Sequence, residues 1–367
     1  MGDVCGVNRA NMKKLLPFLP LLIFSACKVT SPRTSGTIRA QIVQEGLLDC
    51  FENGLANADG SPVTCEGSAI LFDGQSVLVA SDKDIPGERS SIFVWRLENG
   101  RPDTLRRGGA LINPVLKKAT KFEEFARTPD NKHVLLTTGF DRVRPGSTSW
   151  DNYNCLIYWP MGEAAKAKMY GGETSVGLRS AFSKVLAGPA FPDGVPYFKT
   201  EGLTATKDRL YWGIREEGKK YDDFTHKIKV VSVGYRFYGD SLALANDWSV
   251  VADIHVSEPG LPEPLAISSI EFDPHRNRFW ILTSYEKGSD LASFLWTATL
   301  EEFRAGKLTP VRDDAGQPLR FRHKGEDLTF TDARHLMVIH DEDRAQIPVN
   351  GKVRQLNQTP YSIVRIE

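Results

Sequence analysis

The feature that most constrains the fold of this chain is a hairpin pattern that recurs five times. Each copy has a short apolar strand, a polar turn, and a second apolar strand that ends in charged residues. In the first copy these parts are residues 68–72, the turn Asp73-Gly74 and residues 77–83. The first strands of the five copies pass through the residues Ser68, Glu123, Glu201, Ser268 and Glu326. Their β-branched and aromatic content and their turn residues predict five β-hairpins.

A third strand follows each hairpin, so each copy has the parts of one propeller blade. These third strands are expected at residues 92–95, 156–159, 230–233, 294–296 and 363–366. Neighbouring copies start 55 to 78 residues apart, which suits four-stranded blades with uneven loops and is too irregular for a solenoid. The pattern therefore predicts an all-β chain folded as a single β-propeller. Five blades are favoured, and the alternative is six, with an extra blade between Trp159 and Lys199.

The ends of the chain predict how the ring closes. The fifth copy runs out of residues after its third strand, at 361–367. We expect residues 37–43 to supply its missing outer strand and so to remove an exposed sheet edge. The propeller domain would then span residues 37–367. Short helical insertions are expected at 161–169 and 300–305.

The amino terminus has the marks of an export signal. Lys13 and Lys14 precede an apolar run at residues 15–26. That run is shorter than the roughly 20 residues of a membrane-spanning helix, and it ends in small residues, as a secretory signal does. We therefore predict a signal peptide over residues 1–26, with translation starting at Met12.

The first residue after this predicted signal is Cys27, preceded by the small residue Ala26. The arrangement resembles the lipobox of bacterial lipoproteins, although Phe24 stands where leucine is usual. The resemblance implies a lipid on Cys27 and a short tether over residues 27–36, and the alternative is ordinary cleavage near Ala26. By the sorting rule known for such lipoproteins, Lys28 implies the outer membrane. The chain is thus expected in the bacterial cell envelope, held by lipid and facing the periplasm.

The charge balance limits the kinds of partner. Lysine and arginine together number 46, as do aspartate and glutamate, so the formal net charge is zero. A nucleic acid bound by bulk electrostatics is therefore not expected. Local clusters of either sign are still allowed.

Three cysteines other than Cys27 lie in the exported part. Cys50 and Cys65 bracket a polar loop, and an oxidising envelope permits disulfides. We predict that they pair, which would stabilise the fold by about 3 kcal/mol. Cys155 lies in an apolar run and is expected to be a buried free thiol.

Charged residues are expected to gather on one face of the propeller. The first strand of a blade begins, and its second strand ends, on the same face near the central channel. Three copies begin with Lys-x-Glu, and the second strands end in charged residues, three of them arginines: Asp82, Lys83, Asp141, Arg142, Arg215, Glu216, Glu286, Asp341, Asp343 and Arg344. The predicted ligand-binding residues of the channel rim are Lys121, Glu123, Arg142, Lys199, Glu201, Arg215, Lys324, Glu326 and Arg344.

The arginines of this rim could hold a carboxylate or phosphate by paired hydrogen bonds. The alternative is structural, with each Lys-x-Glu pair locking an inner strand to its neighbour. Ser68 and Ser268 replace the glutamate in two copies. This uneven ring favours a functional role, because a purely structural device would more often repeat in every blade.

The same rim offers oxygen ligands of the kind that Ca²⁺ prefers. The candidate metal ligands are Glu123, Glu201, Glu326, Asp341 and Asp343. His340 stands beside the last two and could be a metal ligand or a general base, but a solvated turn at 340–343 is favoured. The chain has no G-x-S-x-G, H-E-x-x-H or EF-hand motif, so nothing indicates a serine hydrolase or a zinc protease.

The motif Glu201-Gly202-Leu203, followed by residues 209–215, resembles bacterial extracytoplasmic propeller families. One is the family labelled esterase-like activity of phytase, and another is a related family of unknown function. The hairpin at Glu326 and its charged end at 341–344 are similar to the same pattern. The resemblance covers residues 65–345 and implies the propeller fold more than a particular chemistry.

Two functions remain. The first is an envelope lipoprotein whose propeller rim binds a small anionic or protein ligand without catalysis. The second is a Ca²⁺-dependent phosphoester hydrolase resembling propeller phytases, in which Arg142, Arg215 and Lys199 hold phosphate and a metal-bound water attacks. The balanced charge favours binding, because a propeller phytase should carry more acidic residues around its channel.

Overall fold

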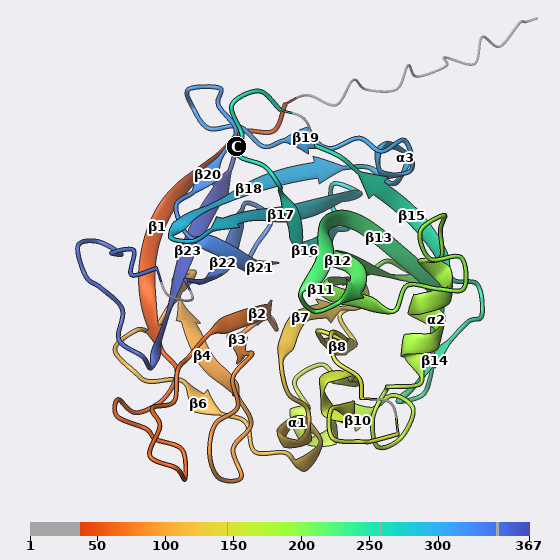
Figure 1. Cartoon of the computed structure of the whole chain (residues 1–367). Helices are drawn as coiled ribbons and strands as arrows, with labels where there is room; N and C mark the ends of the chain where they lie inside the picture. Colours follow the sequence, from red (N-terminus) through yellow and green to blue (C-terminus); the bar gives the residue numbers. More distant parts are fainter. Residues whose placement is uncertain (1–36, 145, 257, 343–344) are drawn as a thin grey trace, which may run out of the picture. The chain divides into compact units, whose positions relative to one another are not determined.

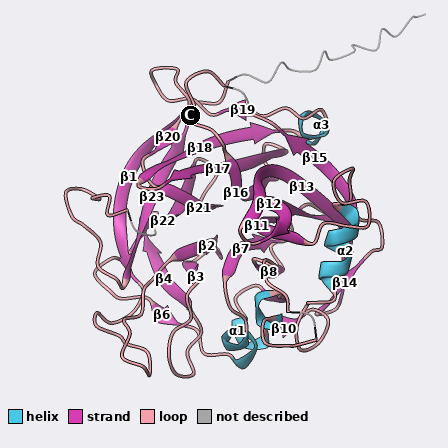
Figure 2. Ribbon diagram, viewed as in Figure 1, coloured by secondary structure: helices cyan, strands magenta, loops and turns pink. Residues whose placement is uncertain are grey.

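The computed structural model describes residues 37–144, 146–256, 258–342 and 345–367, which form five antiparallel sheets around a central opening (Figure 1). Strands make up about half of this part, and its three short α-helices lie at the outside of the ring (Figure 2). Each sheet is one blade. The predicted five-bladed propeller is therefore confirmed, and the six-bladed alternative is not. The predicted signal peptide, the lipidation at Cys27 and the tether fall outside the described residues.

Within each blade, successive strands of the chain lie further from the centre. Blade 1 consists of β2 (Gly67–Phe72), β3 (Ser76–Ser81), β4 (Ile92–Glu98), β5 (Arg101–Pro102) and β6 (Gly109–Ala110). Blade 2 consists of β7 (Phe122–Arg127), β8 (His133–Thr138), β9 (Leu156–Pro160) and β10 (Lys168–Met169). Blade 3 consists of β11 (Tyr197–Ala205), β12 (Arg209–Lys220), β13 (Asp223–Tyr238), β14 (Ser241–Leu244) and β15 (Ser249–Ile254).

Blade 4 follows the same plan, whereas blade 5 takes its outermost strand from the amino-terminal part of the domain. Blade 4 consists of β16 (Ala266–Asp273), β17 (Arg278–Lys287), β18 (Asp290–Ala298), β19 (Thr309–Pro310) and β20 (Arg320–Phe321). Blade 5 consists of β21 (Lys324–Phe330), β22 (His335–Asp341), β23 (Gln358–Ile366) and β1 (Ala40–Asp49). The innermost strands β2, β7, β11, β16 and β21 contact one another around the central opening.

The amino-terminal strand closes the ring, as predicted. β1 pairs antiparallel with β23, from Ala40 opposite Ile366 to Asp49 opposite Gln358. The strand ends later than the expected 37–43, because it pairs along the whole of β23 rather than only where its own run is apolar. The last blade thus combines both ends of the domain, and the pairing of β1 with β23 holds the ring closed.

Five apolar clusters fill the spaces between neighbouring blades, and each cluster contains one buried tryptophan. These tryptophans are Trp95, Trp159, Trp212, Trp280 and Trp296. Trp95, Trp159 and Trp296 lie on third strands and Trp212 and Trp280 on second strands, and all five serve packing between blades. Burial of such large side chains is the main force that holds the blades together.

The long connection before blade 3 contains no further blade. It forms a 3₁₀ turn at Ala164–Lys166, the short strand β10, and the helix α2 (Leu178–Val185). The helix expected at 161–169 is therefore wrong. Gly162 takes a positive φ of 76°, which starts a turn where a helix would need a negative φ.

The other two helices have well-defined starts. In α1 (Pro114–Lys118), the side chain of Asn113 caps the helix by accepting hydrogen bonds from the backbone amides of Val115 and Leu116. In α3 (Leu300–Arg304), Thr299 and Glu302 form a reciprocal capping box, which explains the helix predicted there. Within the described residues, no helix is long and apolar enough to cross a bilayer.

The cysteines behave as predicted. Cys50 and Cys65 form a disulfide with their Cα atoms 6.4 Å apart. Cys155 is a buried free thiol, and burial raises the pKa of this thiol to about 12. It is therefore protonated and unreactive at neutral pH.

Candidate functional site

A β-bulge at the same place in all five innermost strands directs the side chains of the site. At each bulge, the pairing with the second strand skips one residue of the inner strand. The skipped residues are Ser68, Glu123, Glu201, Ser268 and Glu326. They are the same five residues that align in the sequence repeat. Because a bulge bends a strand and redirects its side chain, the repeat turns five side chains toward the centre of the ring.

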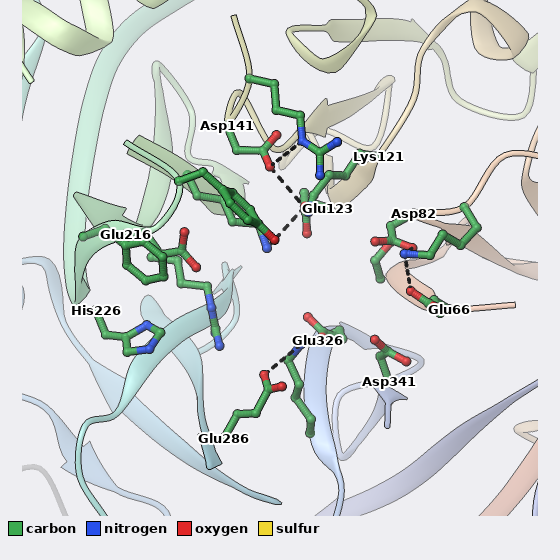
Figure 3. Close-up of a pocket in the computed structure, with 18 of the residues that line it drawn as sticks. Glu66, Asp82, Lys121, Glu123, Asp141, Glu216, His226, Glu286, Glu326 and Asp341 are labelled. Carbon is green, nitrogen blue, oxygen red and sulfur yellow. Dashed lines mark ion pairs between the residues drawn. The ribbon is translucent and has the colours of Figure 1, made fainter. Parts of the chain in front are cut away.

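Three of these side chains line a central cavity of about 480 Å³, which we call the cup, and the other two, Glu201 and Ser268, contact Arg215, which lines it. Ser68, Glu123 and Glu326 line it, whereas Glu201 reaches it through contacts with Lys199 and Arg215. Eight carboxyl groups line the cup: Glu66, Asp82, Glu123, Asp141, Glu216, Glu286, Glu326 and Asp341. Six cations line it: Lys83, Lys121, Arg142, Lys199, Arg215 and Lys324. Figure 3 shows how these side chains converge from the five blades.

Glu123 of blade 2 is held between two lysines. Its Oε1 lies 3.5 Å from Nζ of both Lys121 and Lys199. Burial raises the pKa of Glu123 to about 8, against the opposing effect of the two lysines. Lys199 belongs to blade 3, so this contact joins two blades at the edge of the cup.

The pKa of Glu201 in blade 3 is shifted in the opposite direction. Burial disfavours its charge, but Arg215 and Lys199 overcome that effect and hold the pKa of Glu201 at about 2. Arg215 Nη1 lies 3.0 Å from Glu201 Oε2 and also donates to the hydroxyls of Ser268 (3.0 Å) and Ser284 (2.8 Å) in blade 4. Glu201 is thus ionised, and its arginine bridges blades 3 and 4.

Glu326 of blade 5 resembles Glu123. Lys324 Nζ lies 2.9 Å from Glu326 Oε1 and 3.5 Å from Glu286 Oε2. Burial raises the pKa of Glu326 to about 8, with Lys324 opposing. Burial therefore raises the pKa of two of the three bulge glutamates, whereas the cations beside the third lower its pKa.

Several buried acceptors of the cup have no hydrogen-bond partner among the described residues. They are Asp82 Oδ1, Glu123 Oε1, both carboxylate oxygens of Asp141, and His226 Nδ1. Asp141 is 4% exposed, and its nearest cations, Lys121 and Arg142, lie 3.6 Å from Oδ2. A buried acceptor left without a donor costs about 1–3 kcal/mol. Acceptors of this kind, turned into a cavity, are typical of a place where a ligand supplies the donors.

The backbone around these acceptors is also unusual. Lys121 has φ 65° and Phe140, which precedes Asp141, has φ 50°. Both values lie in the left-handed region that side chains other than glycine rarely adopt. Between them, Gly139 has no side chain where a Cβ would lie 3.0 Å from Glu123 Oε1 and 3.4 Å from Asp141 Oδ1. Strained backbone of this kind gathers at functional sites.

One wall of the cup is aromatic. Tyr221, Phe224 and His226 come from the long hairpin of β12 and β13. The ring centroids of Phe224 and His226 lie 5.4 Å apart. Burial and the charge of Arg215 lower the pKa of His226, so its imidazole is neutral and can accept a hydrogen bond.

The structure brings most of the predicted rim residues together. Lys121, Glu123, Arg142, Lys199, Lys324 and Glu326 line the cup, as does Arg215. The Arg215 side chain is 5% exposed, and its guanidinium is engaged with Glu201 and blade 4. Arg344 and Asp343 fall outside the described residues.

The calcium site stays a prediction. In the part of the chain that the structure describes, no group of three or more His, Cys, Asp or Glu side chains is arranged to hold a metal ion. Glu123, Glu201 and Glu326 each contact a lysine. Asp341 lines the cup and lies 3.8 Å from Arg354.

The solvated turn expected at 340–343 is wrong for its first three residues. His340 and Asp341 are the last residues of β22, and His340 is fully buried. His340 Nε2 lies 2.8 Å from the hydroxyl of Ser362. Glu342 is also buried, and its carboxylate contacts His323 Nδ1. Because the imidazole is enclosed between strands, it does not reach the cup.

The candidate list from the sequence lacked the aromatic wall and Glu66. Tyr221, Phe224 and His226 sit outside the repeat, where β12 and β13 extend beyond the other blades. Glu66 stands two residues before Ser68 and so occupies the position of the lysine in Lys-x-Glu. This alignment could have identified Glu66 as a site residue, but Glu66 carries a negative charge where the other copies carry a lysine.

No protein-family model matches the chain, and no curated protein matches it. Among solved structures, it is similar to the α-L-arabinofuranosidase of Podospora anserina, with 9% identity, a TM-score of 0.43, and coverage of 90% of this chain and 96% of that one. It is also similar to the periplasmic gluconolactonase of Pseudomonas aeruginosa, with 10% identity, a TM-score of 0.36, and coverage of 82% and 88%. Likenesses this low say nothing about what the cup binds, and the five-bladed fold rests on the strand order itself.

Proposed function

We propose that this chain is an envelope lipoprotein whose cup binds a small polyhydroxylated, sugar-like ligand. The observation that carries the proposal is the set of buried acceptors without donors at Asp82, Glu123, Asp141 and His226. They line the same cavity as four lysine ammonium groups. A hydroxyl group can donate one hydrogen bond and accept two. A ligand rich in hydroxyls therefore satisfies the carboxylates and the lysines at once.

The size and walls of the cup support the same class. A cavity of about 480 Å³ lies within the range of small-molecule sites, roughly 300–1,000 Å³. Phe224 and Tyr221 offer apolar faces beside the polar groups, as the C–H face of a sugar ring needs. The ligand class differs from the small anion that the sequence favours, because the buried acceptors without donors need a ligand that donates hydrogen bonds, which an anionic group does not supply.

A glycan array probed with the purified full-length protein tests this proposal. Immobilised sugars should retain the protein, and titration calorimetry should give a dissociation constant for the best ones. Asp141→Asn turns one acceptor into a donor between two cations, so affinity should fall about tenfold or more. Asp240→Asn, at an exposed turn outside the cup, is the matched control. If no sugar binds, or if both variants bind like wild type, the proposal is wrong.

The membrane attachment needs its own test. Cys27→Ala should move the protein from the outer-membrane fraction to the soluble periplasm on a density gradient. Retention of the variant in the membrane fraction would contradict lipid anchoring and leave the binding proposal unaffected.

A second candidate function is hydrolysis of a glycosidic bond. It is favoured by the opposite pKa shifts of the carboxyl groups at the cup. Environments that push carboxyl pKa values apart mark acid and base assignments, and glycoside hydrolysis uses one protonated and one ionised carboxyl group. Glu123, with a pKa of about 8, would be the acid, and Asp141, which lines the same cup, would be the base or nucleophile. Release of 4-nitrophenol from 4-nitrophenyl glycosides, abolished in Glu123→Gln, would support hydrolysis. Binding without turnover would leave the cup as a binding site.

A further inference from the structure

A second cavity of about 510 Å³ adjoins the cup, and we call it the groove. Asp141, Arg142 and Tyr221 line both cavities, so the two lie side by side and share these residues as a common wall. The residues that line the groove and not the cup include Val143, Trp150, Lys219 and Lys220. They come from two segments, the loop after β8 and the tip of the β12–β13 hairpin.

Exposed aromatic and apolar side chains gather in the groove. Tyr221 is 64% exposed, and Trp150 and Val143 are each 40% exposed. Trp150 is the most exposed of the seven tryptophans, all of which fall in the described residues. The other tryptophans pack in the cores between blades. The partly exposed indole of Trp150 beside a polar cavity therefore suggests a role in binding a ligand. Its flat face suits stacking against a ring.

The charged residues that line the groove are mainly cations, unlike those of the cup. Four cations and one carboxylate line it, whereas carboxyl groups outnumber cations in the cup. Arg179 is occupied with backbone carbonyls, among them that of Phe140. Arg142 stands over the ring of Tyr153 at 4.9 Å and that of Tyr221 at 5.8 Å. The cations of the groove that a ligand can contact are therefore Arg142, Lys219 and Lys220.

The two lysines remain available to a ligand. Lys219 lies 3.6 Å from Asp223 and Lys220 lies 3.0 Å from Asp222, and all four side chains are more than half exposed. Ion pairs in water contribute little, so an incoming anion competes with them easily. The groove therefore combines ring faces with cations.

We propose that the groove is a second subsite, which binds an anionic ring-bearing unit attached to the sugar in the cup. The ligand is then an acidic oligosaccharide, with a neutral unit in the cup and a carboxylate-bearing or phosphate-bearing unit against Trp150 and the lysines. The inference rests on the proposed function, since it extends the same ligand. It also gives the anionic part of the ligand, which the rim arginines predict from sequence, a place outside the cup.

Matched pairs of oligosaccharides test the subsite. The probes are uronic-acid-containing oligosaccharides and the same compounds after reduction of their carboxyl groups to alcohols. At low ionic strength, the acidic member of a pair should bind the full-length protein at least about fivefold more tightly. The preference should vanish in Lys219→Ala/Lys220→Ala and weaken as salt is added. Lys132→Ala/Lys166→Ala removes the same charge from exposed lysines outside the groove and should leave the preference unchanged.

Trp150 provides a second readout. Its fluorescence should be shielded from acrylamide by acidic oligosaccharides, and Trp150→Phe should lose that signal while it keeps binding of neutral monosaccharides. Equal binding of acidic and reduced probes, or an unchanged preference in the double lysine variant, would overturn the subsite and leave the cup proposal standing. If neither neutral nor acidic sugars bind, both proposals fail together.

Discussion

Replacing Asp327 by asparagine should remove a defined part of the pH dependence of folding. Asp327 directly follows the bulge of blade 5 and is fully buried. Its Oδ2 accepts a hydrogen bond from the Ile70 amide at 2.7 Å. The hydroxyl of Ser269 lies 2.9 Å from its Oδ1 and 2.8 Å from Glu124 Oε1. This network joins blades 1, 2, 4 and 5 around the centre of the ring.

The network needs a proton. A serine hydroxyl has one hydrogen, so it can donate to only one of the two carboxyl groups. The other must be protonated in order to donate to the serine oxygen. Burial agrees, because it raises the pKa of Glu124 well above its usual range and, despite several hydrogen bonds, the pKa of Asp327 to about 7.

The size of the effect follows from the shift of Asp327 from its ordinary value of 3.8 to about 7. At low pH both folded and unfolded states hold the proton, and the contribution to stability is intact. As pH rises above the unfolded pKa, the unfolded state releases the proton first, so stability falls until the folded pKa is passed. Between pH 5 and pH 8 this one group should lower the free energy of unfolding by about 3 kcal/mol.

Urea unfolding at pH 5, 6, 7 and 8 measures the effect. Asp327→Asn should unfold about 1 kcal/mol more easily at pH 5, because an amide cannot match every partner of the carboxyl group. Its stability should then decline by about 3 kcal/mol less than that of wild type up to pH 8. Asp290→Asn, exposed at the β17–β18 turn, should decline as wild type does. Parallel curves for wild type and Asp327→Asn would refute the shared proton.

Three further changes test the ion pairs, the disulfide and the metal prediction. Glu201→Gln should destabilise the fold by about 3 kcal/mol in urea, because Arg215 stays buried without its counter-charge; a change below about 1 kcal/mol would contradict the bridging role. Cys50→Ser/Cys65→Ser should lower the free energy of unfolding by about 3 kcal/mol, and a reducing agent should then have no further effect. Neither EDTA nor Ca²⁺ should shift the melting temperature by more than about 1 °C, whereas a Ca²⁺-induced rise that Glu326→Gln removes would establish the calcium site.

The fold could be predicted because its determinants are local and repeated. Alternating apolar residues and turn signals mark each hairpin, and five copies with one strand missing at the end predict both the blade number and the closure by β1. The Cys50–Cys65 pair was predictable for the same reason, since a short polar loop brings the two residues together. The helix expected at 161–169 failed because one turn glycine outweighed a run of good helix formers.

The site was predictable only where it follows the repeat. The bulge glutamates and their lysines recur at fixed positions, so the sequence indicates that they meet. Tyr221, Phe224 and His226 depend on a hairpin that extends beyond the other blades, and no repeat marks its length. Ser269 and Glu124 meet across the ring from blades 4 and 2, and nothing near either residue in the sequence indicates the other.

The uneven ring of bulged residues has two causes, and only one of them is functional. Ser268 stands where glutamate would occur because Arg215 of blade 3 reaches across to it while holding Glu201. Ser68 donates to the carbonyl of Phe122 at 2.6 Å and so joins blade 1 to blade 2. Both serines thus serve joints between blades, and their presence is no sign of a ligand by itself. The functional signal is instead that Glu123 and Asp141 keep acceptors without donors although lysines stand beside them. A purely structural ring would have closed those hydrogen bonds, as Arg215 does for blade 4.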